Sequence, residues 1–148
     1  MTAVICYASY SGNTQEVAQL IAETIIVSGR EVVLHRIDGR TPPPNLAKFD
    51  IVLIGSFTWG KGETPRIVKN WVAGVGYKPD NVYIFGTGDT QFGGDELFCK
   101  AADKLAKFYN SELPPLKIEQ SPRGAQENKV REWTKGVLRI EKRHLKQG

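Results

Sequence analysis

The sequence predicts an α/β protein in which a parallel sheet lies between two layers of helices. Short apolar, β-branched runs alternate five times with segments whose apolar residues recur at helical spacing. The runs AVICYA and DIVLIG show no polar–apolar alternation, which is typical of strands buried on both faces of a parallel sheet. Strands joined through helices in this way take right-handed crossovers.

The elements are expected in strict alternation along one domain that spans residues 1–148. Strands are predicted at 3–8, 31–37, 50–55, 82–85 and 116–119. Helices are predicted at 13–27, from Pro65 in the first turn through Trp71, at 95–109 and at 127–145. Three consecutive prolines at 42–44 require a loop between the second strand and the third.

Composition narrows the classes of protein to consider. The chain is 41% hydrophobic and 24% charged, which is ordinary for a globular domain. No apolar run approaches the roughly 18 residues of a membrane-spanning helix. No basic segment precedes the first apolar run, so no signal peptide is evident and we expect a cytoplasmic protein.

Neither cysteine suggests a metal site, because Cys6 and Cys99 lie outside any CxxC pair and away from histidine. Cys6 is expected in the core. A redox-active disulfide between the two stays open as an alternative, although such bonds are uncommon in the cytosol. His35 and His144 are both expected to be solvated.

Positive charge is concentrated near the C-terminus. The net charge is +4, and residues 129–148 carry seven Lys or Arg and two Glu. Such a segment could face an acidic protein partner, particularly near Arg139, Lys142 and Arg143, or be an idle solvated helix face. It lacks the repeated aromatic residues of a nucleic-acid platform, and we expect neither nucleic acid nor a membrane as a partner.

Three loops at the carboxyl ends of strands contain the candidate ligand-binding residues, because ligands of open parallel sheets bind at this edge. The first loop, SYSGNT at 9–14, supplies hydroxyls, an amide and backbone N–H groups at a helix N-terminus. These groups suit a phosphate that is bound without a counter-cation. The loop has neither the lysine of a Walker loop nor a GxGxxG pattern, so we expect a phosphate monoester.

The other two loops add flat aromatic side chains. Residues 56–63 contain Trp59, and a tryptophan among flexible residues is best covered by a stacked planar ligand. Residues 86–94 contain four glycines, which let the backbone approach a ligand, and Phe92 offers a second ring. A site with phosphate-binding groups and two aromatic faces suits a ligand with a flat ring and one phosphate. This favours FMN over FAD or NAD.

Three segments resemble flavodoxins: YASYSGNTQEVAQLI, DIVLIGSFTWGKGETP and VYIFGTGDTQFGGDELFCKAADKL. The resemblance runs from about residue 3 to residue 109 and is weaker beyond. It implies a flavodoxin-like three-layer sandwich with strand order 2-1-3-4-5 and FMN at the switch between the first and third strands, an arrangement for which flavodoxin is a standard example. The fifth strand has no long insertion, which resembles the short-chain type.

The resemblance also implies a role for each loop. The first would bind the FMN phosphate, through Ser9, Tyr10, Ser11, Gly12, Asn13 and Thr14. The second would flank the phosphate and ribityl chain and stack Trp59 on the ring, through Ser56, Phe57, Thr58, Trp59 and Gly60. The third would cover the other face and approach the pyrimidine edge, through Thr87, Gly88, Asp89, Phe92 and Gly93. No residue would be catalytic or bind a metal, since the cofactor supplies the chemistry.

By resemblance, the chain would be a monomeric, low-potential electron carrier and not an enzyme. It would take electrons from a flavodoxin/ferredoxin–NADP reductase and pass them to an acceptor redox protein. The alternative is the flavodoxin-like activator of class Ib, dimanganese ribonucleotide reductase, which residues 92–119 also resemble. Such activators tend to lack the TWGxGE-type loop present here. A quinone or azo reductase would need a substrate pocket over the flavin, and no third aromatic loop supplies one.

The chain departs from flavodoxins in charge. Flavodoxins are usually acidic, whereas this chain is basic, and Lys61 stands where many relatives have Asp. We expect Lys61 to favour the anionic reduced cofactor by about 1 to 2 kcal/mol, for a cation about 8 Å away at an effective dielectric of about 20 to 40.

Overall fold

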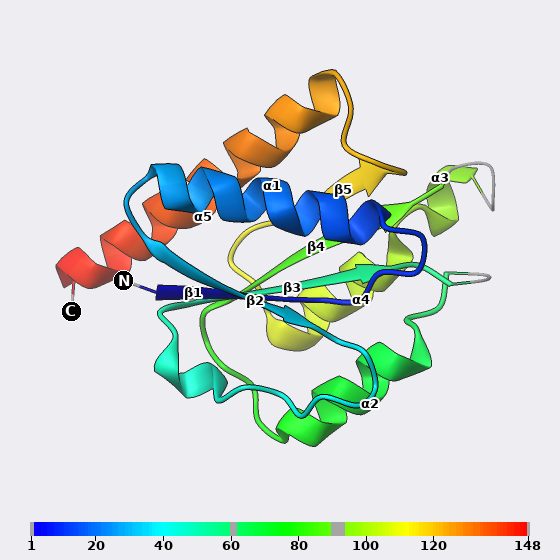
Figure 1. Cartoon of the computed structure of the whole chain (residues 1–148), viewed down its shortest axis with the longest axis horizontal. Coiled ribbons are helices and arrows are strands. Elements are labelled where there is room, and N and C mark those ends of the chain that lie inside the picture. Colours follow the sequence, from blue (N-terminus) through cyan, green and yellow to red (C-terminus); the bar gives the residue numbers. More distant parts are fainter. Residues whose placement is uncertain (1, 60–61, 90–93, 148) are drawn as a thin grey trace.

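The computed structural model describes residues 2–59, 62–89 and 94–147. Its centre is a sheet of five parallel strands in the order β2-β1-β3-β4-β5 (Figure 1). The strands are β1 (Thr2–Tyr7), β2 (Glu31–Arg36), β3 (Ile51–Phe57), β4 (Val82–Gly88) and β5 (Leu116–Glu119). The predicted α/β class and the strand order implied by the resemblance are both confirmed.

Helices cover both faces of the sheet (Figure 1). One face carries α1 (Asn13–Val27) and α5 (Ala125–Gln147), which pack against each other. The other carries α2 (Arg66–Val75), α4 (Lys100–Tyr109) and the short 3-10 helix η1 (Leu46–Lys48). The short helix α3 (Gly94–Leu97) lies at the end of the sheet where β4 finishes.

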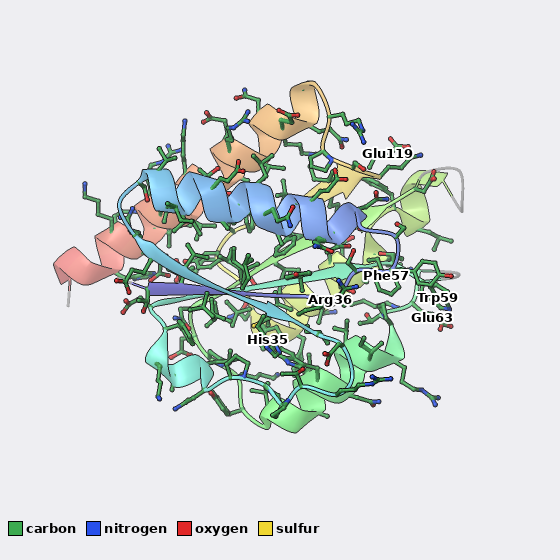
Figure 2. All side chains as sticks on the ribbon, viewed as in Figure 1. His35, Arg36, Phe57, Trp59, Glu63 and Glu119 are labelled. Atoms are coloured by element: carbon green, nitrogen blue, oxygen red, sulfur yellow. The ribbon has the colours of Figure 1, made fainter. Side chains whose placement is uncertain are left out.

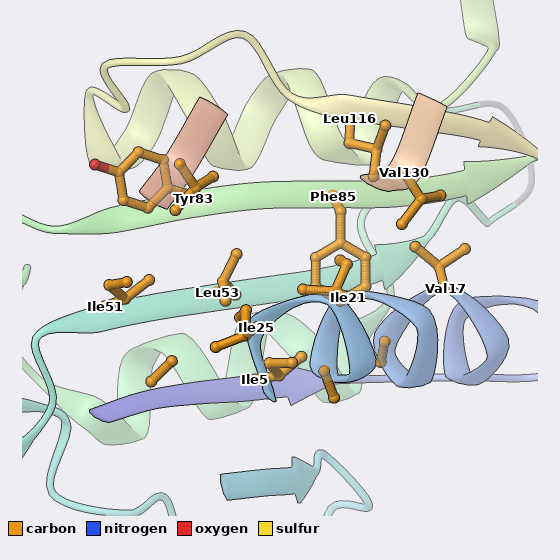
Figure 3. Close-up of a cluster of buried hydrophobic side chains, with 14 of the residues drawn as sticks. Ile5, Val17, Ile21, Ile25, Ile51, Leu53, Tyr83, Phe85, Leu116 and Val130 are labelled. Carbon is orange, nitrogen blue, oxygen red and sulfur yellow. The ribbon is translucent and has the colours of Figure 1, made fainter. Parts of the chain in front are cut away.

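The core has two halves because the inner strands are buried on both faces. Along β1, Ile5 packs under α1 while its neighbour Cys6 packs on the side of α2 and α4. Leu53 and Phe85 of β3 and β4 join Ile5 on the α1 side (Figure 3). The apolar runs therefore lack alternation for the reason expected, since each successive side chain enters one half of the core or the other.

Several predicted boundaries were wrong. The helix expected at 95–109 is broken at Cys99, whose φ of 52° is left-handed, so that α3 and α4 are separate helices. Strands β3 and β4 continue to Phe57 and Gly88, beyond the predicted ends. Pro65 precedes α2 as its N-cap, with an extended ψ of 143°, instead of lying in the first turn.

The two histidines are less free than expected. The Nε2 atom of His35 accepts a hydrogen bond from Trp71 Nε1 at 3.1 Å, and the His35 side chain is partly buried. Burial lowers the pKa of His35, while the nearby charge of Asp38 opposes that shift. His144 lies 2.7 Å from Glu112 Oε1 at the surface. The prediction of solvated histidine was therefore wrong for His35.

Both cysteines are buried and free, so they do not form a disulfide. Burial raises the pKa of each thiol to about 12. A thiol with so high a pKa holds almost no thiolate at neutral pH and reacts slowly. Cys6 is the core residue that the sequence predicted.

The basic segment makes up most of α5, all but its first turn. Arg131 pairs with Glu127 and Lys135 with Glu132 along this helix. Figure 1 shows α5 running away from the carboxyl ends of the strands, so that the C-terminus lies near the start of β1. In the described part of the chain, no helix is long and apolar enough to cross a membrane.

Candidate cofactor site

A cleft of about 410 Å³ opens at the carboxyl ends of β1, β3 and β4. It brings together residues from all three predicted loops: Tyr10, Ser11, Asn13, Phe57, Thr58, Trp59, Thr87, Gly88 and Asp89. Leu97 and Gln120 complete the lining. The candidate residues Gly60, Phe92 and Gly93, and also Lys61, lie outside the described residues.

The loop at 9–14 presents backbone donors at the N-terminus of α1. Gly12 is the N-cap and has a φ of 95°, a conformation that favours glycine. The Ser9 hydroxyl accepts hydrogen bonds from the backbone N–H groups of Gly12 (3.1 Å) and Gln15 (3.3 Å). Within the described residues, the N–H groups of Ser11, Asn13 and Thr14 donate no hydrogen bond. These three N–H groups are therefore available to bind an anion, and the helix dipole favours such binding.

Two side-chain contacts hold this loop against distant parts of the chain. The hydroxyls of Thr14 and Thr87 lie 2.7 Å apart in the interior and join the loop to the end of β4. The Ser121 hydroxyl donates to Asn13 Oδ1 at 2.9 Å, which joins the loop to the segment after β5. Ser9, Gly12 and Thr14 therefore shape the loop from behind the cleft lining, while Ser11 and Asn13 face the cleft.

A cation from outside the loop lies beside it. Arg36 ends β2 opposite Tyr7 of β1, and its guanidinium donates to the Ser9 carbonyl (3.3 Å) and to Gln15 Oε1 (3.2 Å). The loop residues alone could not reveal this neighbour. The predicted sheet could have done so, because the second and first strands are adjacent and end at the same edge.

Three aromatic rings gather at the mouth of the cleft. The Tyr10 ring centroid is 5.2 Å from that of Trp59 and 6.0 Å from that of Phe57, and the last two are 5.9 Å apart. Tyr10 is 74% exposed and Trp59 is 50% exposed. Figure 2 shows Trp59 near Phe57 and Glu63 at one edge of the molecule. Large, exposed rings beside a cleft provide a surface on which a flat ligand can stack.

The base of the Trp59 loop is closed by its backbone. Trp59 and Glu63 exchange two N–H···O=C hydrogen bonds, each of 2.8 Å. The Gly62 carbonyl also accepts a hydrogen bond from Lys104 Nζ at 3.0 Å. These contacts fix both ends of the segment that follows Trp59.

Two hydroxyls of the second loop are engaged in the protein itself. Ser56 is fully buried and does not line the cleft, and its hydroxyl donates to the Phe57 carbonyl at 2.7 Å. The Thr58 hydroxyl accepts the backbone N–H of Ala101 (3.2 Å) in the first turn of α4. Thr58 lines the cleft and satisfies an otherwise free helix donor at the same time.

Glycines of the third loop make room for the protein as well as for a ligand. A Cβ atom on Gly86 would lie 2.8 Å from the Cβ of Ala102 on α4. A Cβ on Gly88 would lie 3.0 Å from the backbone nitrogen of Cys99. The prediction that these glycines serve ligand approach missed this role in seating α4 against β4.

The segment after β5 also reaches the cleft, which the three-loop prediction missed. The backbone N–H of Gln120 donates to the Gly88 carbonyl (2.8 Å), and its side chain donates to Asp89 Oδ2 (3.1 Å). Because β5 is parallel to β4, its carboxyl end meets the same edge of the sheet. Within the described residues, no group of three metal-binding side chains occurs here or elsewhere.

Comparisons with known proteins agree with this fold. The family model described as Flavodoxin matches residues 5–133. A Bacillus subtilis protein named probable flavodoxin 2 is 29% identical over 135 residues, which cover 86% of this chain and 87% of the relative. The crystal structure of oxidised flavodoxin 2 from Bacillus cereus has a TM-score of 0.80 and 30% identity, over 95% of this chain and 99% of that one. Oxidised flavodoxin 1 of the same species shares the fold, with a TM-score of 0.83 at 23% identity, over 94% of this chain and 98% of that one.

The fold and the cleft define a doubly wound α/β protein with a cleft where the strand order reverses, which is where proteins of this class bind their ligands. The chain belongs to the flavodoxin family, whose members are flavin-binding electron carriers. The expectation of a short-chain flavodoxin is confirmed, and these relatives favour the electron carrier over the ribonucleotide reductase activator.

Proposed function

We propose that the cleft binds FMN and that the chain carries single electrons at low potential from a reductase to an acceptor redox protein. The observation that best supports this proposal is that a helix N-terminus with free N–H donors and an exposed tryptophan lie in the same cleft. A ligand that uses both ends must have a phosphate and a flat ring. When bound, FMN supplies the redox chemistry, and the protein positions it and adjusts its potential.

The phosphate end is supported by donors and charge. Ser11, Asn13 and Thr14 offer backbone N–H groups, and the Ser11 side chain faces the cleft. Arg36 adds a positive charge to the outer side of the loop. An isolated helix N-terminus attracts anions only modestly, and a cation beside it strengthens that attraction.

The ring end is supported by the aromatic cluster and by the residues across the cleft. Trp59 would stack on the isoalloxazine, with Tyr10 and Phe57 holding its orientation from behind. The backbone at Thr87, Gly88 and Asp89 would face the pyrimidine edge, held there by Gln120. No side chain in this cleft is required as an acid, a base or a nucleophile, so the protein itself need catalyse no reaction.

Titration of the apoprotein with FMN tests the proposal. We expect quenching of flavin fluorescence at one-to-one stoichiometry, and a loss of affinity of about two- to tenfold in Trp59→Leu, because a stacked aromatic pair adds about 0.5–1.5 kcal/mol beyond buried area. Trp133→Phe is the matched control, since Trp133 lies on α5 and donates to the Pro114 carbonyl. No binding of FMN by the apoprotein would refute the proposal.

A second measurement separates the carrier from an enzyme. A carrier should take up two electrons in two resolved one-electron steps during anaerobic potentiometric titration, and oxidise NAD(P)H very slowly when no reductase is present. A single two-electron step, or rapid NAD(P)H oxidation by the protein alone, would contradict single-electron transfer. Sedimentation of the loaded protein should give the mass of a monomer.

A further inference from the structure

A groove of about 600 Å³ runs between α2 and α4, on the face of the sheet opposite α1 and α5. Its apolar lining comes from both helices and the turn after α2: Val72, Tyr77, Leu105 and Phe108. Tyr77 is 46% exposed and Phe108 is 39% exposed. Large apolar side chains that gather in one exposed groove are typical of interaction sites.

Lysines surround this apolar floor. Lys69, Lys78 and Lys104 line the groove, and its lining contains no Asp or Glu. Lys78 Nζ lies 3.9 Å from the centroid of the Phe108 ring, so one ammonium group already covers part of the apolar lining. Within the described residues, none of the three lysines forms an ion pair. The groove therefore offers positive charge that no carboxylate among the described side chains pairs with.

The groove adjoins a hollow that leads toward the cofactor cleft. Thr64 and Lys69 line both the groove and this hollow, and the hollow shares Tyr10, Phe57 and Trp59 with the cleft. Lys104 of the groove also donates a hydrogen bond to the Gly62 carbonyl in the Trp59 loop. A segment bound in the groove would thus sit beside the hollow that Trp59 lines.

The basic segment of α5 is the weaker candidate for an acidic partner. Two of its cations are paired within the helix. The helix runs away from the carboxyl ends of the strands (Figure 1), where the cleft lies. Electron transfer requires the partner to lie near the cofactor. A partner held by the lysines of the α2–α4 groove would meet this requirement.

We propose that the α2–α4 groove docks an acidic, amphipathic segment of the redox partner. Apolar side chains of that segment would cover Val72, Leu105 and Phe108, and its carboxylates would face the three lysines. Paired charges around an apolar centre set partner choice and speed association. The inference rests on the proposed function only for the redox role of the partner, because docking itself needs no flavin.

The test uses the FMN-loaded, ¹⁵N-labelled protein and two synthetic amphipathic helical peptides. Both have leucine on one face, and the other face carries either glutamate or lysine. We expect the glutamate peptide to bind saturably and to shift amide signals of residues 64–78 and 104–108, while the lysine peptide leaves them unmoved. The double variant Lys69→Glu/Lys78→Glu should bind the glutamate peptide about tenfold more weakly or worse. It spares Lys104, which holds the Trp59 loop.

The matched control is Arg139→Glu/Lys142→Glu, which makes the same change of net charge on α5. It should bind the glutamate peptide as the wild type does. Equal weakening in both variants, equal binding of both peptides, or shifts outside the groove would overturn the proposal. Groove signals that shift with protein concentration alone would identify a second copy of the chain as the occupant and would also overturn it. The flavin absorbance of each sample reports FMN binding separately, so the two proposals fail independently.

Discussion

The phenol of Tyr83 on β4 donates a 2.6 Å hydrogen bond to the buried carboxyl group of Glu141 on α5. Tyr83 is 2% exposed and Glu141 is 7% exposed, so the contact joins sheet and helix inside the α1–α5 half of the core. Burial and the Glu141 carboxylate both raise the pKa of Tyr83 well above its usual value, which keeps the phenol protonated as the donor. The pair compensates for an acidic side chain in an otherwise apolar layer.

Tyr83→Phe should lower the free energy of unfolding by about 1–3 kcal/mol, because it leaves the Glu141 carboxylate buried without this donor. Urea denaturation followed by circular dichroism measures the change. Tyr77→Phe is the control, since Tyr77 is exposed and its hydroxyl makes only a 3.4 Å contact with Asn45. Equal stability of Tyr83→Phe and the wild type would show that the contact contributes nothing.

The hydrogen bond from Trp71 to His35 should make stability depend on pH. Only neutral imidazole can accept at Nε2, and burial lowers the pKa of folded His35 below its ordinary value of 6.5. The unfolded chain then binds more protons as pH falls below 6.5, so the free energy of unfolding falls through this range down to the folded pKa. Above pH 6.5 the contribution is fully present.

His35→Gln tests this dependence. The wild type should exceed this variant in stability by about 1 kcal/mol at neutral pH, and the difference should shrink as the pH is lowered. Urea titrations at matched pH values give both numbers. His144→Gln, which changes the exposed contact with Glu112, should not reproduce the pattern. A difference that stays constant with pH would argue against His35 as its source.

Arg36→Gln should weaken FMN binding about fivefold while leaving riboflavin binding nearly unchanged. A cation about 8 Å from a phosphate at an effective dielectric near 40 contributes about 1 kcal/mol, and riboflavin has no phosphate to feel it. Fluorescence titration with both ligands, at low and high salt, separates an effect of the Arg36 charge from an effect on the shape of the loop. Arg40→Gln, in the loop after β2, should bind both ligands as the wild type does. A parallel loss for riboflavin would mean that Arg36 only supports the loop.

Gly86→Ala should destabilise the fold by about 1–3 kcal/mol, because the added methyl group would meet Ala102 at 2.8 Å and push α4 from the sheet. Gly74→Ala is the matched substitution. Gly74 lies in α2 with no atom within 4 Å of the added carbon, so alanine should stabilise this helix by about 0.5–1 kcal/mol. Thermal unfolding of both variants should therefore shift in opposite directions.

The sheet was predictable because its signal is local. Doubly buried strands such as β1 and β3 are continuous apolar runs, and each is followed by polar residues that can only be loop. Boundaries set by tertiary contacts were not predictable in this way. Residues 95–109 have helical periodicity throughout, yet Cys99 packs against β4 and β5 in a left-handed conformation, and no local pattern shows that constraint.

The site was predictable where its residues follow strands in the chain, as with Tyr10, Trp59 and Asp89. Arg36 and Gln120 were missed because neither the end of β2 nor the segment after β5 carries a ligand-like motif. They reach the site only through the positions of β2 and β5 in the sheet. The contact of Thr58 with α4 was missed for a related reason, since its helix partner lies 43 residues further along the chain.

The paired backbone bonds between Trp59 and Glu63 act as a clasp at the base of a short loop. The clasp uses main-chain atoms alone, so it does not depend on the side chain of Glu63. Its neighbour Gly62 is constrained, because a φ of 87° favours glycine. Glu63 is exposed, and it is therefore a position at which evolution, or a protein engineer, can change the charge beside the aromatic cluster while the backbone of Trp59 keeps its place.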